Sequence, residues 1–170
     1  MPTIDATVAG ESSNSYITLA DADAYFANSL GGSDWAAFTS DKRERALISA
    51  TLVIERLQLR GKQYDRTTPQ ALHFPRITDF AYEIPAAIQR AQCEQALWML
   101  QQQAEPELFD RAALRAQGVT SMSLDGLSES YGGAQHADGL SPIVRSMLRP
   151  YVATAAHIMP RGYNPHANQD

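Results

Sequence analysis

The residue types that most often carry catalytic or metal chemistry are scattered through this sequence. They are the four histidines, the only cysteine and two nearby aspartates: His73, His136, His157, His166, Cys93, Asp21 and Asp23. None of the histidines stands at metal-ligand spacing from another histidine, a cysteine or an acid. Cys93 falls on the apolar face of an expected helix, where a cysteine is typically a small buried hydrophobe. Asp21 and Asp23 are two positions apart and so point to different helix faces. We therefore expect no enzyme, no metal site and no cofactor.

A run of basic residues with aromatic side chains between them is the strongest candidate for contact with nucleic acid. It comprises Arg56, Arg60, Lys62, Arg66 and Arg76, interleaved with Tyr64 and Phe74. Proteins that bind single strands combine basic residues with aromatic rings that stack on bases. The same residues also fit a structural role, because the rings flank Leu72 in a loop that needs anchoring. From the residues alone, we favour packing and fixation of the loop by arginine over direct contact with DNA.

Overall charge and composition narrow the class of protein. The formal net charge of −5 argues against a chain whose whole surface binds nucleic acid. Of the 14 basic residues, only Lys42 and Lys62 are lysines, and arginine makes planar, partly buried contacts better than lysine does. This bias points to subunit interfaces, although a GC-rich genome explains it equally well. One cysteine permits no intrachain disulfide, and no apolar run or basic leader suggests a membrane span or secretion signal. Assembly in a reducing cytoplasm is expected.

The fold class predicted from the 170 residues is mainly α: one helical bundle with a long ordered loop, a small β-hairpin and extended terminal arms. A first helix begins at Thr18 as N-cap and stops at Gly31 and Gly32. A loop over 33–40 follows, anchored by Trp35 and Phe38. The longer helices are predicted at 41–60, capped by Ser40 or Asp41; at 85–103, with Pro85 at its start; at about 106–118; and at 141–158, capped by Ser141 and kinked at Pro150. We expect the helices 41–60, 85–103 and 141–158 to form the core, with Trp98 largely buried between them.

The stretch "QALHFPR" at 70–76 lies in a long irregular segment, 61–84, which fits neither a helix nor a strand well. A loop of this length in a compact domain is usually ordered by its own side chains or is functional. We expect the side chains of Leu72 and Phe74 to be buried in the bundle and to anchor the loop there, and Pro75 to fix the loop's backbone. Arg76 is expected to bond carbonyls or an acid, in the same subunit or in a neighbour.

A change of periodicity near 119–131 predicts a β-hairpin that projects from the bundle, with Asp125-Gly126 as its turn. The segments 1–17 and 159–170 are predicted to be an N-terminal and a C-terminal arm around a domain at 18–158. Because ordering such segments costs about 1–2 kcal/mol per residue, they are expected to order on neighbouring chains.

Several stretches, taken in order, resemble one family. They are "NSYITLADADAYFANS", a Trp before "KRERALISATLVIERLQLRGK", then "QALHFPR" and "IPAAIQRAQCEQALWML". Together they resemble the head-to-tail connector (adaptor) proteins of tailed bacteriophages, many of which are labelled DnaT-like single-stranded DNA-binding proteins. The usual family form of the third stretch is close to "QALAWPR"; His73 and Phe74 stand here in place of Ala and Trp.

The resemblance implies a structural virion protein that forms a ring, usually of twelve copies, at the neck between head and tail. Such a ring extends the channel for double-stranded DNA, which passes without sequence recognition. Its partners would be the portal protein and a tail-side neck or tail terminator protein, with assembly in the host cytoplasm. On this reading, the portal would be contacted by the C-terminal arm through Arg161, Tyr163, Asn164, Pro165 and His166. A neighbouring subunit or the tail-side protein would be contacted by the hairpin through Met122, Leu124, Asp125, Leu127 and Tyr131.

A second reading belongs to another class: a monomer or small oligomer that binds single-stranded DNA in phage replication. Its DNA-facing residues would be Arg56, Arg60, Lys62 and Arg66. Salt-sensitive binding of single strands by a small species would favour this reading, whereas ring formation in the presence of portal would favour the connector.

Overall fold

The structure, a computed structural model, describes residues 3–63, 69–77, 83–105, 121–124, 127–130 and 139–153. Over these ranges the fold is mainly α, as predicted. The helices are α1 (Leu19–Ala27), α2 (Gly32–Ala36), α3 (Ser40–Glu55), α4 (Ala86–Ala104) and α6 (Pro142–Leu148). The strands are β1 (Lys62–Gln63), β2 (Arg76–Ile77), β3 (Ser121–Leu124) and β4 (Leu127–Ser130). Within the described ranges, no helix is both long and apolar enough to cross a membrane.

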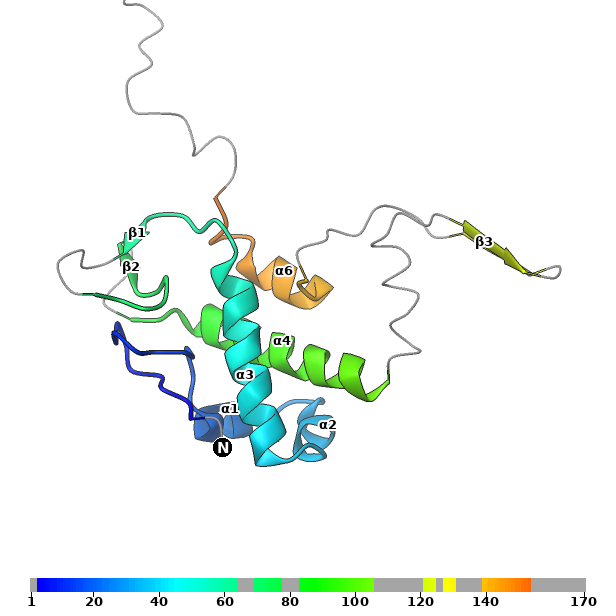
Figure 1. The fold of residues 1–170 in the computed structure, drawn as a ribbon, viewed down its shortest axis with the longest axis horizontal. Coiled ribbons are helices and arrows are strands. Elements are labelled where there is room, and N and C mark those ends of the chain that lie inside the picture. The colour runs from blue at the N-terminus through cyan, green and yellow to red at the C-terminus, as the bar shows by residue number, and fades with distance from the viewer. Residues whose placement is uncertain are drawn as a thin grey trace, which may run out of the picture.

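The centre of the molecule is the crossing of α3 and α4, with α6 packed against α4 (Figure 1). The residues of α3 that are buried are Leu47, Ala50, Thr51 and Ile54, with Ala46. Leu52 is 57% exposed. It lies on the side of α3 turned away from α4, because successive helix positions are rotated by about 100°.

Two clusters of buried side chains form the core. The first surrounds Trp35, where α1 and α2 pack against the first half of α3 and the second half of α4; it includes Phe26, Leu47, Cys93, Leu97 and Leu100. The second lies at the other end of α3 and includes Tyr16, Ile54, Phe74, Ile88 and Leu148. The second cluster joins the N-terminal segment, the loop after β1 and α6 to the same pair of central helices.

The two tryptophans are buried to different extents. Trp35, expected in a loop, lies in the short helix α2 and is only 2% exposed. Its ring stacks on Phe26 at 4.5 Å between centroids, and its indole N–H donates to Asp23 at 2.7 Å. Trp98 on α4 is partly exposed and thus less completely buried than Trp35. The buried face of α4 is made by smaller neighbours such as Ala96 and Leu97.

Several helix boundaries were also misplaced. The N-cap of α3 is Thr39, whose hydroxyl accepts from the Lys42 amide at 3.4 Å, and not Ser40 or Asp41. α6 ends at Leu148, well short of 158, because Pro150 lacks the amide hydrogen that a continuing helix needs. The predicted N-caps Thr18 and Ser141 are confirmed, and α4 begins directly after Pro85.

The N-terminal segment has no regular structure over residues 3–17, as predicted, but it packs on the helices of its own chain. Tyr16 and Ile17 are buried. The fully buried Gln92 of α4 accepts from the Tyr16 amide at 3.0 Å, and its Nε2 donates to Ser15 Oγ at 2.7 Å and to Leu47 O at 3.0 Å. Since buried polar groups are costly unless hydrogen-bonded, this amide holds the segment in place without a neighbouring subunit.

A second buried glutamine on α4 fixes the start of α6. Gln95 Nε2 donates to Gly139 O at 2.9 Å, and Gln95 Oε1 accepts from the Ser141 amide at 3.0 Å. Ser141 is also the N-cap that accepts from the Val144 amide. The position of α6 on α4 is therefore specified by polar contacts as well as by apolar packing.

The predicted hairpin is present as β3 and β4, which pair antiparallel from Ser121↔Ser130 to Leu124↔Leu127. Figure 1 shows it apart from the helices. Met122, Leu124 and Leu127 lie in its strands. Other predictions fall outside the described residues: the helix at 106–118, the turn residue Asp125, Tyr131, and the C-terminal residues Arg161, Tyr163, Asn164, Pro165 and His166.

Candidate nucleic-acid interface

Three segments that are distant in sequence meet where α3 ends (Figure 1). They are 56–63, which follows α3; 69–77, which contains "QALHFPR"; and 139–153, which contains α6. The Arg60 amide donates to Tyr151 O at 2.8 Å, and the Ala153 amide donates to Gln58 O at 2.7 Å. Strand pairing of β1 with β2 joins the first segment to the second. These main-chain bonds place the three segments on one end of the molecule.

Basic residues outnumber acidic ones where these three segments meet, and Glu55, the last residue of α3, is the acid that bonds to one of them, at the His73 amide. The three segments contain no Asp or Glu, and six basic residues that we call the basic corner: Arg56, Arg60, Lys62, Arg76, Arg145 and Arg149. In the segments 3–55 and 83–105, by contrast, acidic residues outnumber basic ones. The net charge of −5 therefore conceals a separation of the two signs.

Three of the six residues of the basic corner have side chains available to meet a ligand. Arg56, Lys62 and Arg149 are exposed, and no side-chain hydrogen bond or ion pair joins them to another residue of the described ranges. Arg60 is exposed as well, and its guanidinium donates to Pro150 O at 3.3 Å. Arg66, the remaining residue of the predicted basic run, lies outside the described residues.

The loop "QALHFPR" buries the side chains expected to anchor it. Leu72 is 9% and Phe74 3% exposed, and Pro75, joined to Phe74 by a cis peptide bond, is fully buried. The Phe74 ring meets Tyr16 and Tyr151 edge to face, each at 5.9 Å between centroids. Phe74 is consequently unavailable for stacking on a base. Tyr64, the other aromatic residue of the predicted run, lies outside the described residues.

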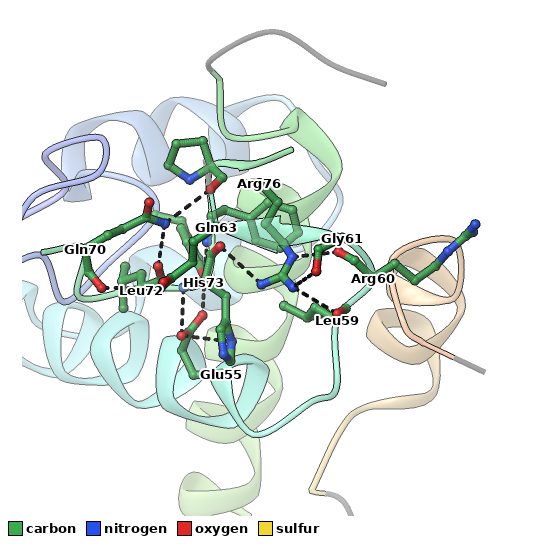
Figure 2. Close-up of polar contacts among 12 residues, drawn as sticks. Glu55, Leu59, Arg60, Gly61, Gln63, Gln70, Leu72, His73 and Arg76 are labelled. Carbon is green, nitrogen blue, oxygen red and sulfur yellow. Dashed lines mark hydrogen bonds and ion pairs between the residues drawn. The ribbon is translucent and has the colours of Figure 1, made fainter. Parts of the chain in front are cut away.

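Arg76 bonds to carbonyl groups of its own chain (Figure 2). Its Nε donates to Arg60 O at 2.6 Å and its Nη2 to Gly61 O at 2.5 Å and Leu59 O at 3.0 Å. Its Nη1 reaches His73 O at 3.5 Å. Burial lowers the pKa of this guanidinium, but arginine stays charged at any physiological pH.

Glu55, the last residue of α3, connects that helix to the N-terminal segment and to the loop. The Tyr16 hydroxyl donates to its Oε1, and the His73 amide donates to its Oε2 at 2.9 Å. The His73 ring nitrogen Nδ1 lies 3.1 Å from the same Oε2. Burial, reinforced by the negative charge of Glu55, raises the pKa of Tyr16. Sequence reasoning missed this cluster because no local pattern pairs residues so far apart in the chain.

The thiol of Cys93 lies in the first core cluster, where burial suppresses its reactivity. Cys93 is fully buried, and burial raises the pKa of its thiol to about 12, with a smaller contribution from Glu94. At pH 8, about one thiol in ten thousand is then ionised. We expect the folded protein to resist the thiol reagent DTNB, with the rate rising about tenfold per pH unit below the pKa.

One thiol per chain should react promptly with DTNB once guanidinium chloride has unfolded the protein, which provides the control. Equal rates in the folded and unfolded protein would show that Cys93 is accessible and would contradict its buried position.

The fold and the basic corner define a small, mainly helical protein in which six of the ten basic residues of the described ranges lie in three segments that meet at the end of α3. A family model described as "Putative DnaT-like ssDNA binding protein" matches residues 3–162. The chain belongs to that family. No curated protein and no solved structure matches it.

This family match corrects the identification as a head-to-tail connector, because it describes single-stranded DNA binding. The expected virion role, the portal and tail-side partners, the ring of twelve and the channel for double-stranded DNA are overturned with it. The connector identification rested on the resemblance of four stretches of sequence, while the net charge of −5 argued only against a chain whose whole surface binds nucleic acid. The fold brings six basic residues of three segments together at the end of α3, an arrangement that net charge does not reveal.

Proposed function

We propose that this protein binds single-stranded DNA through the basic corner. The observation that carries the proposal is the meeting, next to Glu55 at the end of α3, of three segments that together hold six Arg and Lys and no Asp or Glu. Phosphate neutralisation by such side chains releases counterions and supplies most of the affinity of sequence-independent binding. The family description supports the single-stranded form of the ligand.

The exposed cations come from three different parts of the fold: Arg56 at the end of α3, Arg60 and Lys62 in the following turn, and Arg149 after α6. A flexible single strand can adjust its backbone to such an arrangement, whereas a duplex presents phosphates at fixed spacing. We also propose that the protein acts by binding rather than by catalysis, since Cys93 is inaccessible and the Tyr16, Glu55 and His73 groups bond to one another.

The test removes three exposed charges together: Arg56→Gln, Lys62→Gln and Arg149→Gln. Binding of a fluorescent oligothymidine is measured by anisotropy over a series of salt concentrations. For single strands the slope of log K against log salt is about −0.7 per phosphate contact, so the triple variant should lose about 2 from the magnitude of the slope. The same relation predicts about 50-fold weaker binding near 0.15 M salt.

A matched control removes the same charge at three exposed positions outside the basic corner, through Lys42→Gln, Arg45→Gln and Arg90→Gln. We expect this control to keep nearly all of the salt slope. Equal losses in the two triple variants would mean that net charge alone governs binding. A duplex competitor that displaces the oligothymidine as well as unlabelled single strand does would refute the preference for single strands.

A further inference from the structure

We infer that Arg76 is a positioning residue of the basic corner: it holds the turn Leu59–Gly61 so that Arg60 and Lys62 face the DNA, without binding phosphate itself. This inference rests on the proposed function and adds the residue that organises the site. The guanidinium of Arg76 donates to three main-chain carbonyls on the other side of a loop.

The contacts show how one side chain orders the turn. Three consecutive carbonyls, those of Leu59, Arg60 and Gly61, accept hydrogen bonds of 3.0, 2.6 and 2.5 Å from a single guanidinium. The chain reverses here through Gly61, whose φ of +81° is open to glycine at little cost. Since these carbonyls turn toward Arg76, the turn has a defined conformation. Figure 2 shows the Arg60 side chain extending away from Arg76.

Arg76 is itself well fixed. It pairs with Gln63 in the short β1–β2 ladder, and its Nη1 also reaches His73 O at 3.5 Å. The far side of the turn is tied to the segment after α6 by the bond from the Arg60 amide to Tyr151 O. The turn is consequently held between two parts of the chain, and Arg76 supplies the contacts on one of these sides.

The same geometry leaves Arg76 little capacity for phosphate. A guanidinium has five N–H donors in a planar fork, and four of them are directed at carbonyls here. Lysine cannot replace this arrangement, because its ammonium has three donors on a point charge and lacks the fork. Arg76→Lys therefore preserves the charge but removes most of the hydrogen bonds that fix the turn.

Because Arg76→Lys keeps the charge but loses the hydrogen bonds to the turn, it distinguishes a positioning role from direct contact with phosphate. If Arg76 positions the turn, Arg76→Lys should weaken oligothymidine binding by up to about tenfold and reduce the salt slope by about 1, since two phosphate contacts are loosened. Trypsin should also cleave faster after Arg60 and Lys62, as detected by mass spectrometry of early fragments. The control Arg90→Lys, at an exposed position of α4, should change none of these quantities.

A double-mutant cycle shows whether the effect passes through Arg60 and Lys62. In the Arg60→Gln, Lys62→Gln background, adding Arg76→Lys should weaken binding by less than twofold. If Arg76→Lys reduces the yield of folded protein, Gly61→Ala disturbs the same turn and should give the same loss of slope. A wild-type slope and affinity in Arg76→Lys, or a full additional loss in the double background, would overturn the inference.

The two proposals can fail separately. Absence of salt-dependent oligothymidine binding in the wild-type protein would refute the proposed function. The tryptic rates would then decide the positioning role alone: faster cleavage after Arg60 and Lys62 in Arg76→Lys supports it, and an unchanged rate overturns it.

Discussion

Phe74→Ala is expected to lower the free energy of unfolding by about 3–5 kcal/mol, the usual range for removing a buried phenylalanine. Phe74 is 3% exposed and lies between the rings of Tyr16 and Tyr151, in edge-to-face contact with both. Its removal would leave a cavity where the N-terminal segment, the "QALHFPR" loop and the segment after α6 meet. Urea melts followed by circular dichroism measure the loss.

The matched control for this variant is Ile77→Ala, three residues along the chain and 56% exposed. Its effect should stay near 0.5 kcal/mol, as for most surface substitutions. A Phe74→Ala loss below about 1 kcal/mol would mean that the loop is held without its aromatic plug, and the main-chain bonds to Arg76 would then be the chief contacts that hold it.

Trp35→Ala should likewise lower the free energy of unfolding by about 3–5 kcal/mol. The indole is 2% exposed, stacks on Phe26 and donates to Asp23. Asp23 keeps a second partner in Arg43 at 2.7 Å, so the cost should come from the cavity and lost packing rather than from an unpaired carboxylate. The measurement is again a urea melt, with the slope m compared to exclude a change of unfolded state.

Trp98→Ala provides the comparison, because it removes the same side chain from a half-buried position on α4. We expect a clearly smaller loss of stability than for Trp35→Ala. The reverse order would show that the first core cluster is centred on α4 rather than on the contact between α1, α2 and α3.

Local signals in the sequence predicted the helical class and several details correctly. Thr18 and Ser141 are N-caps in the structure, since a hydroxyl before an apolar periodic segment satisfies amides that the helix leaves unpaired. The hairpin followed from alternation around a two-residue turn. Periodicity also predicted that the helices now labelled α3, α4 and α6 contribute to the core. These features depend on residues within a few positions of one another, so one sequence suffices to find them.

The composition of the basic corner was partly visible, because Arg56, Arg60 and Lys62 lie close together in the chain. The contributions of Arg145 and Arg149 were not visible in the sequence. They join the corner through the packing of α6 on α4, the bond from the Arg60 amide to Tyr151 O and the bond from the Ala153 amide to Gln58 O. Net charge sums over the whole chain and carries no information on where the charges gather.

Only the tertiary structure decided which of the two tryptophans is fully buried and which arginine holds the turn. Trp35 and Trp98 both suited an apolar position, yet only the meeting of α1, α2 and α3 buries the first. Arg60 and Arg76 have the same chemistry, but the carbonyls of a turn on the other side of the loop surround only Arg76. Contacts between residues far apart in sequence select one arrangement through the combined free energy of many groups, and no local pattern in one sequence records that selection.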